Sequence, residues 1–122
     1  MNENWKKLTT EELVGRYREN SANHGRLLDA RKTRAANKEY DRATAIEAEL
    51  RLRGAEANER ILKLLDDPEP GTRFWAASAA LRFAPEEAAR VLAELAKPPM
   101  SMVGLSATMT LEDWQGGTYK PE

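Results

Sequence analysis

The chain contains one histidine, His24, and no cysteine, so few residue types for nucleophilic or metal-assisted chemistry are present. A hydrolytic site would need the imidazole within reach of a serine hydroxyl and an orienting carboxylate. His24 instead shares helical spacing with Leu13, Tyr17 and Leu28, which places it on the apolar face of one helix. We interpret His24 as a packed structural histidine rather than as a catalytic base or a pH switch.

Three carboxylates, Asp66, Asp67 and Glu69, surround a proline-rich turn. They could hold Ca²⁺ or Mg²⁺, but the spaced oxygen ligands and the turning glycine of an EF-hand loop are missing. Neighbouring carboxylates at a helix end also diverge, so they do not meet at one substrate atom. We interpret them as turn and capping groups, and we predict an ion pair between Asp67 and Arg73 across the turn.

Basic side chains recur at helical spacing within residues 31–42 and form the only basic strip of the sequence: Arg31, Arg34, Lys38 and Arg42, joined by Arg26 and Lys32. A strip that contacted phosphates would bind nucleic acid in a salt-dependent way. The chain as a whole lacks the strongly basic character of a nucleic-acid binder. We interpret the strip as a solvated face or as a contact for an acidic protein. Nucleic-acid binding through Arg34, Lys38 and Arg42 is the alternative.

Trp75 lies to one side of the apolar line of its predicted helix, and we expect Met100, Met102 and Trp114 to approach it. Aromatic and methionine side chains are enriched at protein-binding surfaces, although core packing is their usual role. Two interpretations are therefore open. The group belongs to the core, or it forms a groove for a partner protein with Arg73 beside Trp75.

Composition indicates a soluble helical domain, because 41% of the 122 residues are hydrophobic, 32% are charged and 7% are aromatic. We expect neither a bilayer-spanning segment nor a signal peptide, and we predict a cytoplasmic protein. Without cysteine, disulfides and thiolate metal sites are excluded, and we expect no cofactor. Residues 1–53 contain 12 basic and 9 acidic residues (+3), and residues 54–122 contain 7 and 11 (−4). This asymmetry is mild.

Helix signals divide the chain into three parts. Residues 1–54 predict a long antiparallel hairpin: a capping box of Thr9 and Glu12 starts a helix that runs to about residue 30, and a second helix covers 33–54. Residues 55–97 predict three further helices, a short one around 61–65, one over 70–83 and one from Pro85. Residues 98–122 predict a capping tail with a single helical turn at Thr110–Asp113. We expect one domain.

Two apolar stripes are expected to face the core. In the second helix the stripe consists of Ala36, Tyr40, Ala43, Ile46 and Leu50, and in the helix over 70–83 it consists of Phe74, Ala77, Ser78 and Leu81.

Asp67, Arg73, Ala76, Ala77 and Leu81 occupy places that resemble the pattern of one HEAT repeat. More widely, the chain resembles the bacterial family called Domain of Unknown Function 2019. The matching segments are residues 36–41 (ANKEYD) with 49–54 (ELRLRG), 62–68 with 73–77 (RFWAA), and 84–88 (APEEA) with 109–117 (MTLEDWQGG). The turn at residues 31–33 departs from the Gly-Asp turn expected of the family. The resemblance implies a HEAT-like α-α superhelix and no catalytic residues, and it suggests binding proteins, including toxin neutralisers.

We therefore predict an all-α, HEAT/armadillo-like right-handed superhelix of about five helices, which acts as a non-enzymatic protein-interaction module without a cofactor. The expected partner is a protein, for example a toxin to be neutralised, and the expected oligomeric state is a monomer or weak homodimer away from membranes. The candidate partner-binding residues are Trp75, Arg73, Arg34, Lys38 and Arg42. The alternative function is nucleic-acid binding along the basic strip.

Overall fold

Capping residues and prolines set where the helices begin. The computed structural model describes residues 4–118, which contain six α-helices and no strand. The elements are η1 (Trp5–Lys7), α1 (Thr10–Asp29), α2 (Thr33–Leu52), α3 (Ala55–Lys63), η2 (Leu64–Asp66), α4 (Pro70–Ala80), α5 (Pro85–Leu95) and α6 (Met102–Gln115). The all-α prediction is confirmed. No helix within these residues is long and apolar enough to cross a membrane.

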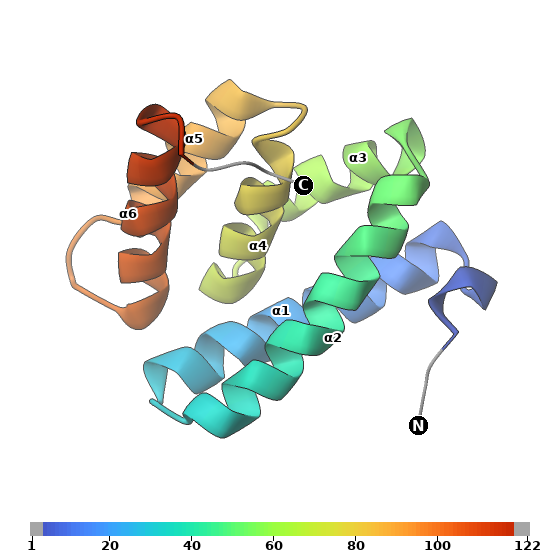
Figure 1. Cartoon of the computed structure of the whole chain (residues 1–122), viewed down its shortest axis with the longest axis horizontal. Helices are drawn as coiled ribbons and strands as arrows, with labels where there is room; N and C mark the ends of the chain where they lie inside the picture. The colour runs from blue at the N-terminus through green and yellow to red at the C-terminus, as the bar shows by residue number, and fades with distance from the viewer. Residues whose placement is uncertain (1–3, 119–122) are drawn as a thin grey trace.

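The helices α1 and α2 form the long antiparallel hairpin along one side of the molecule (Figure 1). The capping box at its start is present: the Glu12 amide donates to Thr9 Oγ1 at 3.0 Å and the Thr9 amide donates to Glu12 Oε1 at 2.9 Å. Arg31 reverses the chain between the helices with φ of 60°. This left-handed backbone region favours glycine, so Arg31 stands in a conformation that suits the Gly-Asp turn expected of the family.

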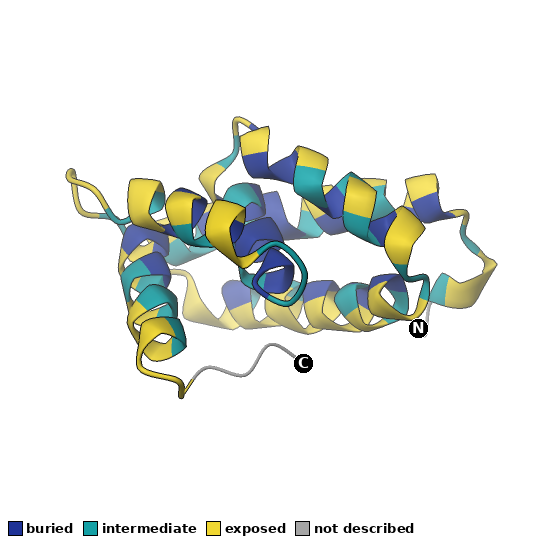
Figure 2. Ribbon diagram, turned by 90° about the horizontal axis from the view of Figure 1, so that it is seen from above, coloured by how far each residue is buried: buried dark blue, intermediate teal, exposed yellow. Residues whose placement is uncertain are grey.

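Helix α4 is the centre of the molecule, because it packs against α1 on one side and against α3, α5 and α6 on the others. The crossing of α1 and α4 is close. A Cβ atom added at Gly25 would lie 2.7 Å from the Cα of Gly71, so only glycine fits there without moving a helix. Buried residues line the facing sides of the helices, and exposed residues cover the outside (Figure 2).

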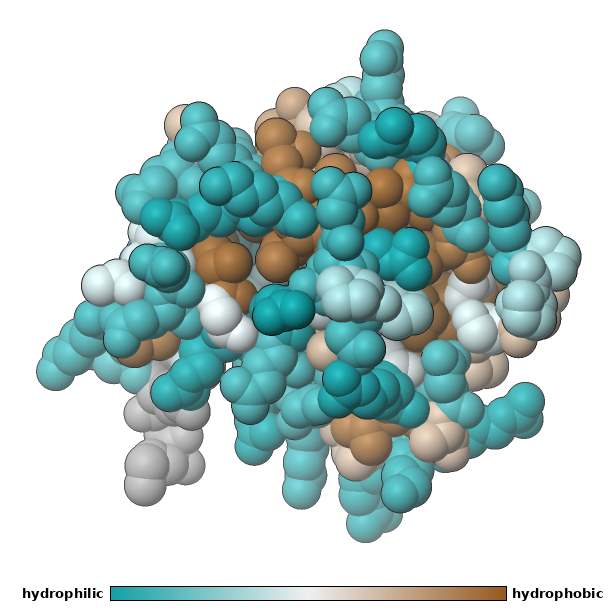
Figure 3. Space-filling view, turned by 180° about the vertical axis from the view of Figure 1, so that it is seen from behind, coloured by the Kyte–Doolittle hydropathy of each residue, from teal (hydrophilic) through white to brown (hydrophobic). Residues whose placement is uncertain are grey.

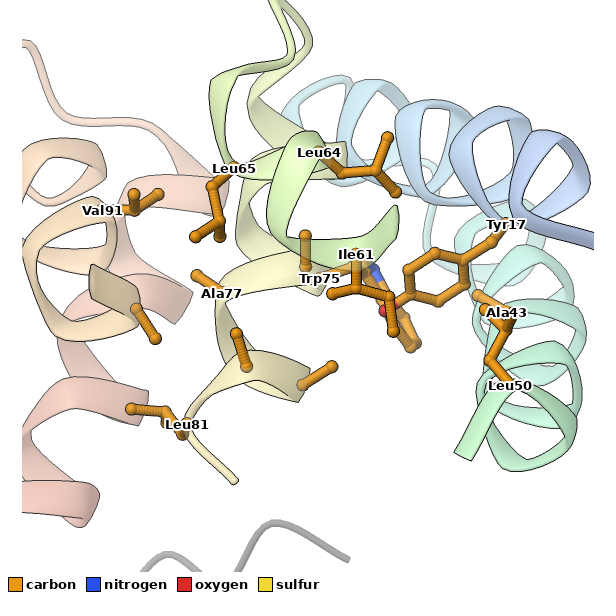
Figure 4. Packing of buried hydrophobic residues seen from close by; sticks show 14 of the residues in the cluster. Tyr17, Ala43, Leu50, Ile61, Leu64, Leu65, Trp75, Ala77, Leu81 and Val91 are labelled. Atoms are coloured by element: carbon orange, nitrogen blue, oxygen red, sulfur yellow. The ribbon is translucent and has the colours of Figure 1, made fainter. Parts of the chain in front are cut away.

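One continuous core joins the hairpin to the other helices (Figure 4). Trp75 and Tyr17 lie against each other between α4 and the hairpin, with ring centroids 6.2 Å apart, whereas Ala77 and Val91 lie on the α5 side of α4. Trp75 is thus a core residue, and the predicted stripe of α4 is only partly correct. Ala77 and Leu81 are buried, but Phe74 and Ser78 are half-buried. On α2 the stripe is confirmed except at Tyr40, which is 51% exposed.

The C-terminal tail differs most from expectation. The predicted single turn is wrong, because α6 covers 14 residues from Met102 to Gln115 and raises the number of α-helices to six. Ser101 caps it by accepting the Gly104 amide at 2.9 Å, and Asp29 Oδ1 accepts the amides of Met102 and Val103. Helix α6 also lies very close to α5, since a Cβ at Gly104 would be 2.7 Å from the Leu95 carbonyl oxygen.

Two smaller boundaries also change. Helix α4 ends at Ala80 rather than near Phe83, and the short third helix covers Ala55–Lys63 before it tightens into η2.

Candidate functional site

Trp75 is the main predicted partner contact, and the residue is only 7% exposed. Its Nε1 donates a hydrogen bond to His24 Nδ1 at 3.0 Å, and both rings belong to an aromatic cluster with Tyr40. The centroid of Trp75 lies 5.4 Å from that of His24 and 5.4 Å from that of Tyr40. Trp75 therefore connects α4 to α1 and α2, and little of it remains for a partner to contact.

A hollow of about 280 Å³ runs over this cluster between α2, α4 and α6, and we call it the aromatic groove. Its lining residues come from four helices: His24, Tyr40, Thr44, Glu47, Phe74, Trp75, Ser78 and Thr110. Tyr40 is the most exposed aromatic residue of the groove. This groove is the hollow next to Trp75, but Met100, Met102 and Trp114, which we expected there, do not line it.

Burial shifts the pKa values of two groups of the aromatic groove, His24 and Glu47, so that their neutral forms are favoured. It lowers the pKa of His24, against the opposing charge of Glu39. It raises the pKa of Glu47, against a hydrogen bond from Tyr17 and the charges of Arg82 and Arg51. The Tyr17 hydroxyl donates to Glu47 Oε1 at 2.5 Å.

The contacts of His24 do not match those of the histidine in a hydrolytic triad. In a triad the imidazole binds a serine hydroxyl through one nitrogen and an acid through the other. His24 Nδ1 accepts the Trp75 hydrogen instead, so the neutral ring carries its own proton on Nε2. The expectation that His24 is packed is confirmed by its burial and by this bond.

Two acids of the turn before α4 pair with α1. Glu69 is the N-cap residue of α4, but its side chain does not cap the helix and pairs with Arg26 instead. Asp67 is buried and pairs with Arg18, whose Nε lies 2.5 Å from Asp67 Oδ1. The other carboxylate oxygen, Asp67 Oδ2, accepts the Glu69 amide at 3.0 Å. The predicted pair of Asp67 with Arg73 is wrong, because α1 crosses α4 here and brings Arg18 to the carboxylate. Arg73 is half-buried, and its Nε makes no hydrogen bond within residues 4–118. No group of three potential metal-ligating side chains occurs in that same range.

The basic strip is only partly available to a partner. Arg42 pairs with Glu39 at 3.0 Å, and Glu39 also accepts a hydrogen bond from Asn20. Arg34 and Lys38 are exposed and make no ion pair within the part of the chain that the structure describes. Together with Arg31 and Lys32 they form what we call the basic corner, at the turn between α1 and α2.

The structure places Met100 and Met102 on a surface of their own, apart from Trp75, which the sequence analysis did not predict. Six large hydrophobic side chains are strongly exposed in the described residues, and four of them lie on α6 or just before it: Met100 (80%), Met102 (36%), Leu105 (41%) and Met109 (58%). We call these four residues the methionine face. The spacing of residues 102, 105 and 109 is typical of one helix face, and Ser101 is a good N-cap, so the signal was present in the sequence.

Seen from behind the view of Figure 1, most protruding side chains are hydrophilic, and hydrophobic residues show between them (Figure 3).

A family model described as "Domain of unknown function (DUF2019)" matches residues 11–114. The chain belongs to this family. The resemblance inferred from the sequence segments is thereby confirmed.

The fold of this DUF2019 chain is similar to the crystal structure of the protein RPA1889 from Rhodopseudomonas palustris CGA009. The TM-score is 0.88 and the sequence identity is 23%, over 99% of this chain and 100% of the other. At this identity the similarity concerns the fold. No curated protein matches the chain.

Proposed function

We propose that this DUF2019 chain is a non-enzymatic protein-interaction module that binds its partner through the methionine face. The observation that carries the proposal is the concentration of exposed apolar side chains on α6 and just before it, four of the six in the described residues. Contiguous exposed apolar surface marks interaction sites in soluble proteins. Methionine suits such a site because its flexible, polarisable side chain adapts to a partner.

The free energy available from burying the methionine face is too small for stable binding by itself. Burying one Met or Leu side chain completely is worth about 1.5–3 kcal/mol, so four partly exposed side chains supply on the order of 3–6 kcal/mol. A dissociation constant of 1 μM needs about 8 kcal/mol. Polar or charged neighbours of the methionine face must therefore contribute to stable binding.

The proposal also includes two more specific points, the HEAT-like order of the helices and the kind of partner. A HEAT-like superhelical order is supported by the packing of consecutive helices, α1 on α2, α4 on α5 and α5 on α6. A toxin to be neutralised is one kind of partner that a small module of this type would bind. Nucleic-acid binding along Arg34 and Lys38 remains the alternative, favoured by the absence of ion pairs at these two residues within 4–118.

Site-specific photo-crosslinking in the natural host tests the proposal. A photoreactive amino acid replaces Leu105 on the methionine face or, as the matched control, Ala93 on the exposed side of α5. We expect position 105 to crosslink to one other protein, with or without nuclease. We also expect that adding Met102→Asp and Met109→Asp removes the crosslink.

Three outcomes would contradict it: equal crosslinking from position 93, loss of the product after nuclease treatment, or a product that contains only a second copy of the chain.

A further inference from the structure

We propose that the element bound by the methionine face is an amphipathic helix with carboxylates beside its apolar side, and that these carboxylates lie over the basic corner. This inference rests on the proposed function and adds the chemistry of the partner. It follows from the position of the two surfaces, from their charge and from the helical nature of the binding face.

The methionine face and the basic corner are continuous. One hollow of about 380 Å³ is lined by Asp29, Arg31, Met100, Ser101, Met102 and Leu105. A second of about 270 Å³ is lined by Leu28, Arg31, Thr33 and Met102. Arg31 and Met102 line both hollows, so a ligand that covers Met100 and Met102 also reaches Arg31, the first cation of the basic corner. Figure 1 shows the start of α6 beside the turn between α1 and α2.

The cations of the basic corner form no ion pair with the described residues. Arg31, Lys32, Arg34 and Lys38 are exposed and take part in none of the ion pairs formed within residues 4–118. Asp29 lines the first hollow beside Arg31 but forms no ion pair with it, and its Oδ1 accepts the amides of Met102 and Val103.

The positive end of α2 and the negative end of α1 meet at this turn, so the two helix dipoles oppose each other there. The charge of the basic corner therefore comes from its side chains. A partner with carboxylates would complement the charge.

A helix fits the apolar part better than an extended segment does. Residues 102, 105 and 109 form a row on one side of α6, and helices recognise such rows by placing their own side chains at three- and four-residue spacing. An extended peptide gains its affinity from the edge of a sheet, and the described part of the chain contains only helices. Nucleic acid would match the cations but would leave the methionines uncovered.

The test uses the full chain and two synthetic probes. Each is a fluorescent amphipathic peptide of about 18 residues, or five turns, with the same leucine face. The flanks of one peptide carry glutamates, and lysines replace these glutamates in the other. Binding is measured by fluorescence anisotropy at low and high salt. We expect the acidic peptide to bind about tenfold more tightly than the basic one at low salt, and the difference to shrink at high salt.

Variants locate the two contacts. Arg34→Glu with Lys38→Glu is expected to weaken the acidic peptide about tenfold and to strengthen the basic one. Leu105→Asp is expected to weaken both peptides. The matched control is Lys63→Glu with Arg90→Glu. Both residues are exposed cations on α3 and α5, and neither forms an ion pair in the described residues. We expect this control to change the affinity for either peptide less than about twofold. Circular dichroism and thermal melting confirm that each variant folds.

Equal affinity for the two peptides, or no binding of the acidic one, would overturn the inference. Single-stranded DNA would also overturn it if it bound the wild type more tightly than the acidic peptide does and lost affinity for Arg34→Glu with Lys38→Glu. If crosslinking from position 105 still captures a partner protein in these cases, the proposed function stands and only the acidic helix is wrong. If that crosslink is also missing, both fail.

Discussion

The bond from Trp75 Nε1 to His24 Nδ1 is the most specific polar contact of the core. Both side chains are buried, and each supplies the partner that the other needs, because an indole N–H can only donate and the unprotonated imidazole nitrogen can only accept. The bond explains why a single histidine is tolerated among apolar residues. It also couples the stability of the core to the protonation of His24.

Stability is expected to fall as the pH drops below about 6.5, the pKa of an unfolded histidine. Burial lowers the pKa of His24 in the folded state, so the unfolded chain binds the proton more readily and acid favours unfolding. Urea denaturation at pH 7.5 and 5.5 measures the effect. His24→Asn keeps an acceptor without titrating near neutral pH, and we expect it to lose this part of the pH dependence.

Glu47 acts in the opposite direction, because burial raises its pKa and the folded state then binds the proton more readily. The comparison is therefore repeated in a Glu47→Gln background. An identical pH dependence of the wild type and His24→Asn would show that His24 does not act this way.

Trp75→Phe leaves His24 Nδ1 without its donor. We expect this substitution to lower the free energy of unfolding by about 1–3 kcal/mol at neutral pH.

At the scale of elements, small residues determine how closely the helices pack. Gly25 and Gly71 bring the backbones of α1 and α4 together, and Gly104 does the same for α6 and α5. Beside the first crossing, Ser21 Oγ donates to Thr72 Oγ1 at 3.0 Å, which satisfies two buried hydroxyls where the helices meet. These contacts place α4 at the centre and position α6 so that its methionine face points outward.

Alanine substitutions at two glycines of α1 should therefore have opposite effects. Gly25→Ala places a methyl group against Gly71 and should lower the free energy of unfolding by about 1–3 kcal/mol, because the helices must separate. Gly15→Ala meets nothing within 4 Å and should raise it by about 0.5–1 kcal/mol, because alanine favours the helix. Urea denaturation measures both. Equal effects of the two substitutions would mean that the close crossing does not determine stability.

At the scale of the whole molecule, the buried residues from α1 to α6 form one cluster. Trp75 contacts the hairpin on one side of α4, and Ala77 lies on the side of α5. The core therefore does not separate into an N-terminal and a C-terminal part, although the sequence divides into a hairpin, three central helices and a tail.

Thermal unfolding is therefore expected to occur in one cooperative transition. Far-ultraviolet circular dichroism, which follows all helices, should give the same midpoint as tryptophan fluorescence, which includes buried Trp75. The calorimetric and van't Hoff enthalpies should also agree. Two separate midpoints would show that the hairpin and the remaining helices unfold independently.

Local signals were sufficient for much of the fold. The capping box of Thr9, the prolines at the starts of α4 and α5 and the apolar spacing of α1 each act within a few residues, so they predict helices and their starts correctly. The family was likewise recognisable from short segments. The signal for α6 is weaker, because the first turn after Ser101 consists of small and apolar residues and contains no acid.

The sequence alone determined that this is an all-α chain of the DUF2019 family with a long hairpin at its start. Only the tertiary structure decided that Trp75 is buried against His24, that Asp67 pairs with Arg18, and that α6 exposes its methionines beside the basic corner. The physical reason is that capping and spacing act within one helix. Burial and pairing instead depend on which helices cross, and close crossings such as Gly25 with Gly71 join residues far apart in the chain.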